Sequence, residues 1–160
     1  MINILITGGA GHVGASLANK LSEKDNVSIV ILDNLSTGKK QNLLLRENIK
    51  FIEGDINKIS GMEAMLKEQP FNYIFHYSAV VGVQRTQDHP LLVFDDIDGI
   101  KNILSIALQH STQRVYFSSS SEVYGEPVEI PQHEMTTPLN SKIPYAIVKN
   151  VGESFLRSYQ

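Results

Sequence analysis

Five short runs of apolar residues recur along the chain, separated by longer stretches of mixed polarity. The runs occupy residues 2–6, 27–32, 49–53, 72–76 and 114–118, and they are rich in Ile, Val, Phe and Tyr. The first two are almost continuously apolar, which is typical of strands that are buried on both faces of a sheet. We therefore predict five β-strands at these positions.

Apolar residues between these runs recur at helical spacing. The pattern predicts helices over residues 12–23, 58–68 and 91–109, and in the last of these Val93, Ile97, Ile100, Leu104 and Leu108 form a long stripe. Strands that alternate with helices indicate an α/β fold with a doubly wound, Rossmann-like parallel sheet. Segment 125–144 carries four prolines and is predicted to be a long irregular connection, of a kind that is often functional.

Composition narrows the class of protein. A length of 160 residues predicts one domain over residues 1–160. The formal net charge of −3 gives no basic surface for nucleic acid or an anionic membrane. Neither a signal peptide nor an apolar run of about 18 residues is evident, so we expect a cytoplasmic protein with no nucleic-acid or membrane partner. The chain has no cysteine, which excludes disulfides and thiolate metal sites, and we expect no metal site.

A glycine-rich turn, TGGAGHVG, follows the first apolar run. Gly9, Gly11 and Gly14 satisfy the pattern G-x-G-x-x-G, and Gly8, Gly11 and Gly14 satisfy T-G-x-x-G-x-x-G. In either frame, glycine lets the backbone approach a pyrophosphate whose charge lies at a helix N-terminus. A turn of small residues without a ligand is the structural alternative, but the strand before and the helix after favour a dinucleotide.

Asp33 ends the second apolar run, nineteen residues after Gly14. An acid at this position can accept hydrogen bonds from the adenosine ribose hydroxyls and would repel a 2′-phosphate, so NAD is favoured over NADP. Alternatively, Asp33 is an ordinary turn residue before Asn34. Lys39 and Lys40 follow closely, and one of them could hold a phosphate.

Polar residues that suit oxidation of an alcohol follow the last apolar run. Ser119, Ser120 and Glu122 lie just after it, where ligands bind in open α/β sheets. Tyr145 and Lys149 are spaced to share one face of a helix. To act as a base near pH 7, Tyr145 would need a pKa about 3 units below its usual value near 10, and the Lys149 ammonium and a positively charged nicotinamide are suitable causes. A serine hydroxyl could then hold the substrate oxygen while Tyr145 takes its proton.

These motifs together resemble a known family. TGGAGHVG, LDNLSTGK, GDI, SSSSEVYGE and YAIVK occur in the order found in the extended short-chain dehydrogenase/reductases, specifically the NAD-dependent nucleotide-sugar epimerase/dehydratase group. The resemblance runs from Ile2 to Gln160 but spans only about the N-terminal half of a typical member. It implies a chain that lacks the C-terminal strands and the lobe that binds the nucleotide-sugar.

The resemblance also assigns roles by position. It implies that Ser120, Tyr145 and Lys149 are catalytic, and that Tyr145 and Lys149 also contact the cofactor. The other cofactor-binding residues that it implies are Gly8, Gly11, His12, Val13, Gly14, Asp33, Asn34, Leu35, Ser36, Thr37, Gly38, Asp55, Ile56, Tyr77, Ser78, Ala79 and Ser118.

Three residues depart from the family pattern or bear on it. His12 stands where the family usually has an aromatic or bulky apolar residue. Asp96 occupies a position that is usually asparagine, which puts an active-site hydrogen bond from that residue in doubt. His76, which ends a predicted strand, is expected to be structural rather than catalytic.

The pair Ser121-Glu122 bears on the type of reaction. The 4,6-dehydratases of the family have Asp-Glu here, whereas Ser-Glu is similar to the UDP-glucuronate decarboxylases and to some epimerases. The resemblance therefore implies a 4-epimerase acting on a UDP- or dTDP-linked sugar with NAD. A decarboxylase, a dehydratase and a catalytically silent NAD-binding fragment remain alternatives. The resemblance further implies a homodimer that pairs through helices 91–109 and 145–160.

Overall fold

The computed structural model describes residues 1–44, 46–68 and 70–159, and the chain divides into two compact units. The first unit comprises Met1–Ala79 and Asp98–Phe117. The second comprises Val80–Ile97 and Ser118–Gln160. The long helix α4 (Pro90–Gln109) contributes its first part to the second unit and its last part to the first.

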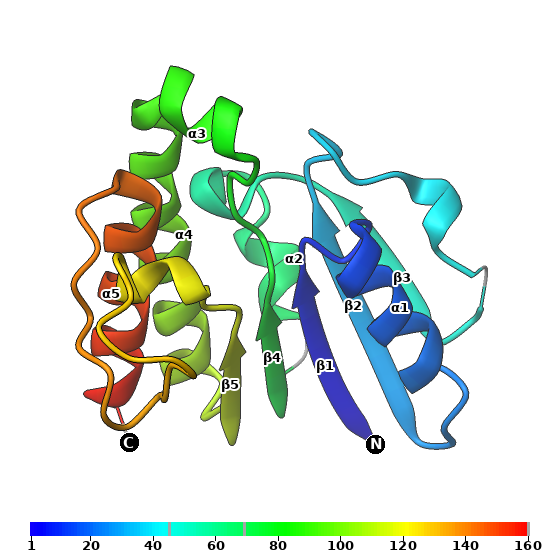
Figure 1. Cartoon of the computed structure of the whole chain (residues 1–160). Helices are drawn as coiled ribbons and strands as arrows, with labels where there is room; N and C mark the ends of the chain where they lie inside the picture. Colours follow the sequence, from blue (N-terminus) through cyan, green and yellow to red (C-terminus); the bar gives the residue numbers. More distant parts are fainter. Residues whose placement is uncertain (45, 69, 160) are drawn as a thin grey trace. The chain divides into compact units, whose positions relative to one another are not determined.

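A five-stranded parallel sheet forms the first unit (Figure 1). Its strands are β1 (Ile2–Thr7), β2 (Val27–Asp33), β3 (Ile49–Glu53), β4 (Tyr73–His76) and β5 (Arg114–Phe117). They lie in the order β3-β2-β1-β4-β5, and all four pairings are parallel. The carboxyl ends of all five strands therefore lie at one edge of the sheet.

Alternate residues of the central strands bury the two faces of this sheet in separate cores. Leu5, Val30 and Leu32 pack with side chains that include Leu66 of α2 (Glu63–Lys67) and Ile103 of α4. Ile4, Ile6, Ile29 and Ile31 pack on the other face with Ala18 of α1 (His12–Leu21). Helices thus cover both faces, which confirms the predicted doubly wound fold.

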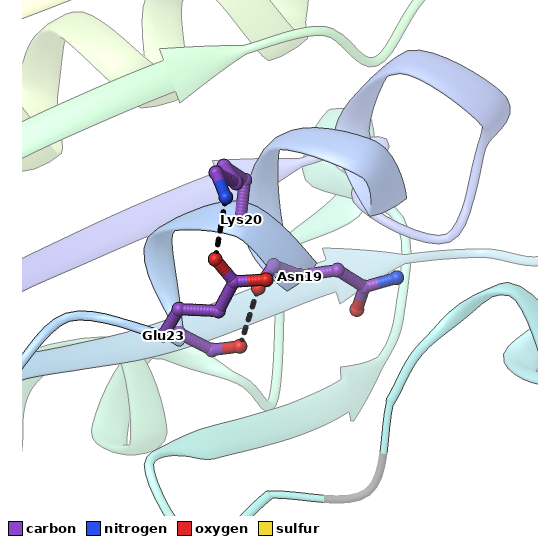
Figure 2. Close-up of polar contacts among 4 residues, drawn as sticks. Asn19, Lys20 and Glu23 are labelled. Atoms are coloured by element: carbon purple, nitrogen blue, oxygen red, sulfur yellow. Dashed lines mark hydrogen bonds and ion pairs between the residues drawn. The ribbon is translucent and has the colours of Figure 1, made fainter.

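Polar contacts lie at the C-terminal end of α1 (Figure 2). Lys20 Nζ lies 2.6 Å from Glu23 Oε2, and this contact lowers the pKa of the Glu23 carboxyl below its usual value. Ser22 Oγ donates to the carbonyl oxygen of Asn19 at 2.7 Å. The side chain of Asn19 donates to the Asn42 oxygen and accepts from the Leu44 N–H. These two hydrogen bonds hold the chain at residues 42–44 against α1.

The second unit consists of helices and irregular chain. It contains α3 (Val83–Asp88), the first part of α4, the 3₁₀ helix η3 (Ser121–Tyr124) and α5 (Pro144–Arg157). Residues 125–143 connect η3 to α5 with no helix or strand, as the sequence predicts. Helix α3 was not predicted. The helix predicted over 58–68 is shorter, because Gly61 takes a φ of +86° and α2 begins only at Glu63.

Within the described part of the chain, no helix is both long enough and apolar enough to cross a membrane.

Candidate active site

The glycine turn after β1 leaves no room for side chains at two of its positions. Gly8 takes a φ of +68°, and a Cβ on it would lie 2.7 Å from the Ser78 nitrogen. A Cβ on Gly14 would lie 2.5 Å from the Gly8 oxygen. Both distances are shorter than real Cβ contacts, so glycine is required where the turn, the start of α1 and the end of β4 meet.

The N-terminus of α1 is open to a ligand. Gly11 is its N-cap and supplies no side-chain hydrogen bond, and no acidic residue lies in the first turn. The first N–H groups of a helix have no partners within it and carry the positive end of the helix dipole. His12 and Val13 are exposed at this end. An uncapped helix start beside glycine backbone fits the phosphates of a dinucleotide.

Asp33 braces the glycine turn from the end of β2. Asp33 is only 6% exposed. Oδ2 accepts a hydrogen bond from the Ala10 N–H at 2.9 Å, and Oδ1 accepts one from the Leu35 N–H at 2.8 Å. Asp33 therefore has a structural role, and each oxygen retains a second lone pair for another donor.

A second brace, which the sequence did not reveal, reaches the glycine turn from residues 39–42. The Ala10 oxygen accepts hydrogen bonds from the Lys39 N–H at 3.0 Å and from Asn42 Nδ2 at 2.8 Å. The side chain of Lys40, a candidate phosphate ligand in the sequence, lies 2.8 Å from Glu53 Oε2 in an ion pair. Lys40 is therefore already paired with a carboxylate.

The ends of β2 and β3 bring Asn34 and Asp55 together. Asn34 Nδ2 donates to Asp55 Oδ2 at 3.3 Å, and Asp55 Oδ1 accepts from the Asn57 N–H at 2.9 Å. Ile56 beside them is buried. Ser36 and Thr37 are exposed, whereas Gly38 packs so closely that a Cβ on it would lie 2.8 Å from Asp33 Oδ1.

The end of β4 is fixed by a buried polar pair. Thr7 Oγ1 lies 2.7 Å from His76 Nδ1, and Thr7 Oγ1 also accepts a hydrogen bond from the Ser78 N–H at 3.3 Å. His76 is 3% exposed, which agrees with a structural role. Tyr77, Ser78 and Ala79 are partly exposed. This pair sets the position of the Ser78 nitrogen that lies against Gly8.

In the second unit, the structure brings the three predicted catalytic residues together. Ser120 acts on the side chain of Tyr145 and lowers the pKa of its hydroxyl, and the Ser120 hydroxyl accepts from the Glu122 N–H at 3.2 Å. Lys149 Nζ lies 5.6 Å from the centre of the Tyr145 ring and donates to the Ser118 oxygen at 2.7 Å. Tyr145 and Lys149 are one helical turn apart on α5, so they share its face as the sequence predicts.

Burial acts on both ionisable groups of this set. It lowers the pKa of Lys149 to about 8, against the opposing effect of the Asp96 carboxylate. It also raises the pKa of Tyr145; the hydrogen bond with Ser120 acts the other way, and Asp96 and Glu122 add to the rise. Burial and the two carboxylates thus act against the lowered tyrosine pKa that a base requires.

A pocket of about 660 Å³ opens beside this set in the second unit. Its described lining includes Tyr145, Glu122, Thr86, Gln87 and Ile143. Ser119 has a different partner: its hydroxyl donates a hydrogen bond to the carboxylate of Glu153 on α5. Tyr145 therefore borders a space that could admit a small molecule, with Glu122 as its acidic neighbour.

Metal ligands do not gather in the described residues: no group of three or more His, Asp or Glu side chains there could hold a metal ion.

Comparison with known proteins identifies the family. The sequence profile of the NAD dependent epimerase/dehydratase family matches residues 4–160. The chain belongs to this family. A UDP-glucose 4-epimerase of Streptococcus mutans is 31% identical over 156 residues, which cover 96% of this chain and 46% of that protein. The chain thus spans about half the length of the curated relatives that it matches.

Solved structures agree with the fold. An epimerase from Methanothermobacter thermautotrophicus matches with a TM-score of 0.90 and 33% identity, over 99% of this chain and 47% of that one. A Thermus thermophilus UDP-glucose 4-epimerase, solved in complex with NAD, matches with a TM-score of 0.86 and 30% identity, over 99% of this chain and 50% of that one. The members of the family that it matches are enzymes.

Proposed function

We propose that this chain carries the cofactor-binding and catalytic residues of an NAD-dependent 4-epimerase that acts on a UDP- or dTDP-linked sugar. The observation that carries the proposal is the Ser120, Tyr145 and Lys149 set, in which Ser120 acts on the pKa of Tyr145 and the amine of the buried Lys149 lies 5.6 Å from the centre of the Tyr145 ring. The match to UDP-sugar 4-epimerases over nearly all of the chain supports the same reaction.

The first unit would hold the dinucleotide. The N-terminus of α1 and the glycine turn would face the pyrophosphate, with Gly8, Gly11, His12, Val13 and Gly14 around it. Asp33 would accept from the adenosine ribose through its remaining lone pairs, with residues 34–38 beside it and Asp55 and Ile56 next to the adenine. Tyr77, Ser78 and Ala79 would lie along the rest of the cofactor. NAD⁺ held by these residues would supply hydride transfer at C4 of the sugar.

The second unit would move the proton. Tyr145 would remove the proton of the C4 hydroxyl while Ser120 donates or accepts at the same oxygen, and the hydride would leave the same carbon. The resulting 4-keto sugar would regain a hydride on its opposite face and its proton from Tyr145. Since burial raises the Tyr145 pKa, its function as a base would need a positive charge near the phenol oxygen.

We also propose that a second copy of the chain covers the outer face of the second unit. Leu91 and Phe94 of α4 are 79% and 64% exposed, and Ile147 and Phe155 of α5 are also exposed. Several of these side chains line an apolar groove of about 290 Å³. Exposed apolar patches of this kind mark interaction sites, and both helices are those predicted to pair. Of the second predicted pairing helix, residues 145–160, α5 covers the part up to Arg157, and Gln160 lies outside the described residues.

One observation favours a second reaction. Glu122 lines the same pocket as Tyr145, and an acid beside the oxidised sugar would suit a UDP-glucuronate decarboxylase. We therefore keep decarboxylation as the second candidate, ahead of 4,6-dehydration.

The experiment begins with the purified chain and measures its thermal unfolding and calorimetric binding with NAD and with NADP. We expect NAD to bind and raise the midpoint temperature more than NADP, because a 2′-phosphate would meet the Asp33 carboxylate. UDP-glucose, UDP-N-acetylglucosamine, UDP-glucuronate and dTDP-glucose are then incubated with the NAD-loaded chain, and the products are identified by proton NMR.

The products distinguish the candidates. A C4 epimer of the supplied sugar supports the proposal. A UDP-pentose and CO₂ from UDP-glucuronate would replace it with decarboxylation, and a 4-keto-6-deoxy sugar would replace it with dehydration. NAD binding without turnover of any substrate would show that the chain by itself is a silent NAD-binding unit.

A further inference from the structure

Helix α5 carries a third polar residue on the face that presents Tyr145 and Lys149. Glu153 lies one helical turn beyond Lys149, and residues four apart on a helix lie on the same side of it. Glu153 belongs to neither the cofactor-binding nor the catalytic residues that the sequence predicts. Its side chain is only 20% exposed, so this face of α5 holds a carboxylate that is largely withdrawn from water.

Both oxygens of this carboxylate have partners in the second unit. Oε1 accepts a hydrogen bond from the Ser119 hydroxyl, and Oε2 lies 3.4 Å from Arg157 Nη2 on the next turn of α5. The contact with Arg157 is local to the helix, whereas the contact with Ser119 joins residues 34 positions apart in the sequence. The carboxylate therefore ties α5 to the chain that follows β5, and Arg157 helps to hold it in place.

Ser119 stands between two residues that the candidate site uses. The oxygen of Ser118, just before it, accepts the hydrogen bond from Lys149 Nζ at 2.7 Å. Ser120, just after it, is a predicted catalytic residue whose hydroxyl accepts from the Glu122 N–H at 3.2 Å. Consecutive Cα atoms are only about 3.8 Å apart. A contact that fixes Ser119 therefore also limits the movement of the Ser118 oxygen and of the Ser120 side chain.

We propose that Glu153 is a positioning residue: through Ser119 it ties the segment 118–120 to the face of α5 that carries the catalytic tyrosine and lysine. Glu153 acts through Ser119 and does not touch the reacting atoms. The role rests on the proposed function, because it serves the residues that are assigned there to proton transfer. It requires a hydrogen-bond acceptor at position 153, and it does not require a negative charge.

The test follows the Lys149 amine by NMR in a chain with ¹³C-labelled lysine, with the signal assigned from the Lys149→Met spectrum. Burial lowers the pKa of this amine to about 8, so its titration midpoint reports how well the surrounding chain covers it. Ser119→Ala removes the donor to Glu153 and leaves all charges in place, including the Asp96 carboxylate that also acts on Lys149. We expect the midpoint to rise by about half a pH unit or more, because water reaches the amine.

Ser154→Ala is the matched control. It makes the same chemical change at an exposed position of α5, directly beside Glu153, and is expected to leave the Lys149 midpoint unchanged. Ser119 is also exposed, so both variants are expected to fold, and urea unfolding checks that they do. A Ser119→Ala midpoint equal to that of the wild-type chain would overturn the proposal.

Two substitutions of Glu153 separate the acceptor from the charge. Glu153→Gln keeps a side-chain oxygen for the Ser119 hydroxyl, whereas Glu153→Ala does not. Both variants lose the negative charge, a loss that by itself would lower the Lys149 midpoint equally in the two. We therefore expect a higher midpoint in Glu153→Ala than in Glu153→Gln. Equal midpoints, or the opposite order, would refute the role of the acceptor.

These titrations need neither NAD nor a sugar. Unchanged midpoints would remove the role of Glu153 and leave the proposed reaction standing. Failure of the reaction would leave the measured link between Ser119, Glu153 and the Lys149 amine standing in the same way.

Discussion

The amine of Lys149 lies 2.7 Å from the main-chain oxygen of Ser118, inside the second unit, and donates a hydrogen bond to it. The contact aligns the lysine along α5 toward the ring of Tyr145 one turn away. A main-chain oxygen carries only a partial charge, so it does not replace the hydration that the ammonium loses on burial. Burial of the Lys149 amine therefore lowers the stability of the folded chain near neutral pH.

Replacement of Lys149 by methionine is expected to change how stability depends on pH. The folded chain holds the Lys149 pKa at about 8 instead of 10.5, which disfavours the folded, protonated form by about 3 kcal/mol. Below pH 8 this cost is fully present. Between pH 8 and 10.5 the folded state releases a proton that the unfolded state keeps, so wild-type stability rises with pH. Lys149→Met lacks this rise.

Urea unfolding of both chains at pH 7, 8, 9 and 10 measures the effect. The stability of Lys149→Met relative to wild type should be greatest at pH 7 and should decline toward pH 10. Lys20→Met, at an exposed position, serves as the control and should show no such trend. A stability difference that stays constant over this range would contradict the lowered pKa.

Asp33→Asn is expected to destabilise the chain even when no ligand is present. The two oxygens of Asp33 accept from two different backbone N–H groups, those of Ala10 and Leu35, whereas an asparagine has only one oxygen. One buried N–H would then lose its acceptor and face an NH₂ group, at a cost of about 1–3 kcal/mol. Chemical denaturation without NAD checks this. Asp25→Asn, at an exposed turn, should change the free energy of unfolding little, and equal stability of both variants would refute the brace.

Tyr145→Phe is expected to remove turnover without removing the fold. The variant keeps the ring beside Lys149 but lacks the hydroxyl that would exchange the substrate proton, so kcat for UDP-sugar conversion should fall about 10²- to 10⁴-fold. NAD binding, followed by calorimetry, should persist because the glycine turn is untouched. Tyr159→Phe, near the end of the described chain and exposed, is the matched control. Retention of full kcat by Tyr145→Phe would exclude Tyr145 as the base.

Phe94→Glu is expected to dissociate the proposed dimer. Phe94 is 64% exposed and lines the apolar groove of the second unit, and a carboxylate there would be desolvated if a second copy covered it. Sedimentation equilibrium should show a dimer for the wild-type chain and a monomer for the variant. Leu108→Glu changes a residue on the same helix that is 60% exposed and does not line the described groove. A wild-type monomer, or a Phe94→Glu dimer of unchanged affinity, would disprove the pairing.

The strands could be predicted because their signal is local. Runs such as residues 27–32 bury both of their faces, so nearly every position is apolar. Helix α3 has no such signal, because its sequence is mainly polar. In the structure, the side chain of Gln84 donates to the carboxylate of Asp88 at an exposed position of this helix. Helix α2 was predicted too long because an apolar face alone does not reveal that Gly61 takes a positive φ.

The sequence predicts the residues of the candidate site but not the hydrogen bonds that support them. The spacing of Tyr145 and Lys149 along a helix is fixed by helical geometry, and the glycines are fixed by close approach of the backbone. The braces on Ala10 come from Asn42 and Lys39, about thirty positions away in the chain. Such hydrogen bonds depend on loop conformation, for which a single sequence carries no periodic signal. The upward shift of the Tyr145 pKa likewise depends on burial, which only the folded chain reveals.

The braces on the glycine turn have a consequence for the strength of binding. A mobile loop that orders on meeting its ligand loses conformational entropy, and this loss weakens the observed affinity. Here Asp33 and residues 39–42 already hold the Ala10 backbone in place. A ligand at the start of α1 would meet a preorganised surface, and little of its interaction free energy would be offset by ordering of the turn.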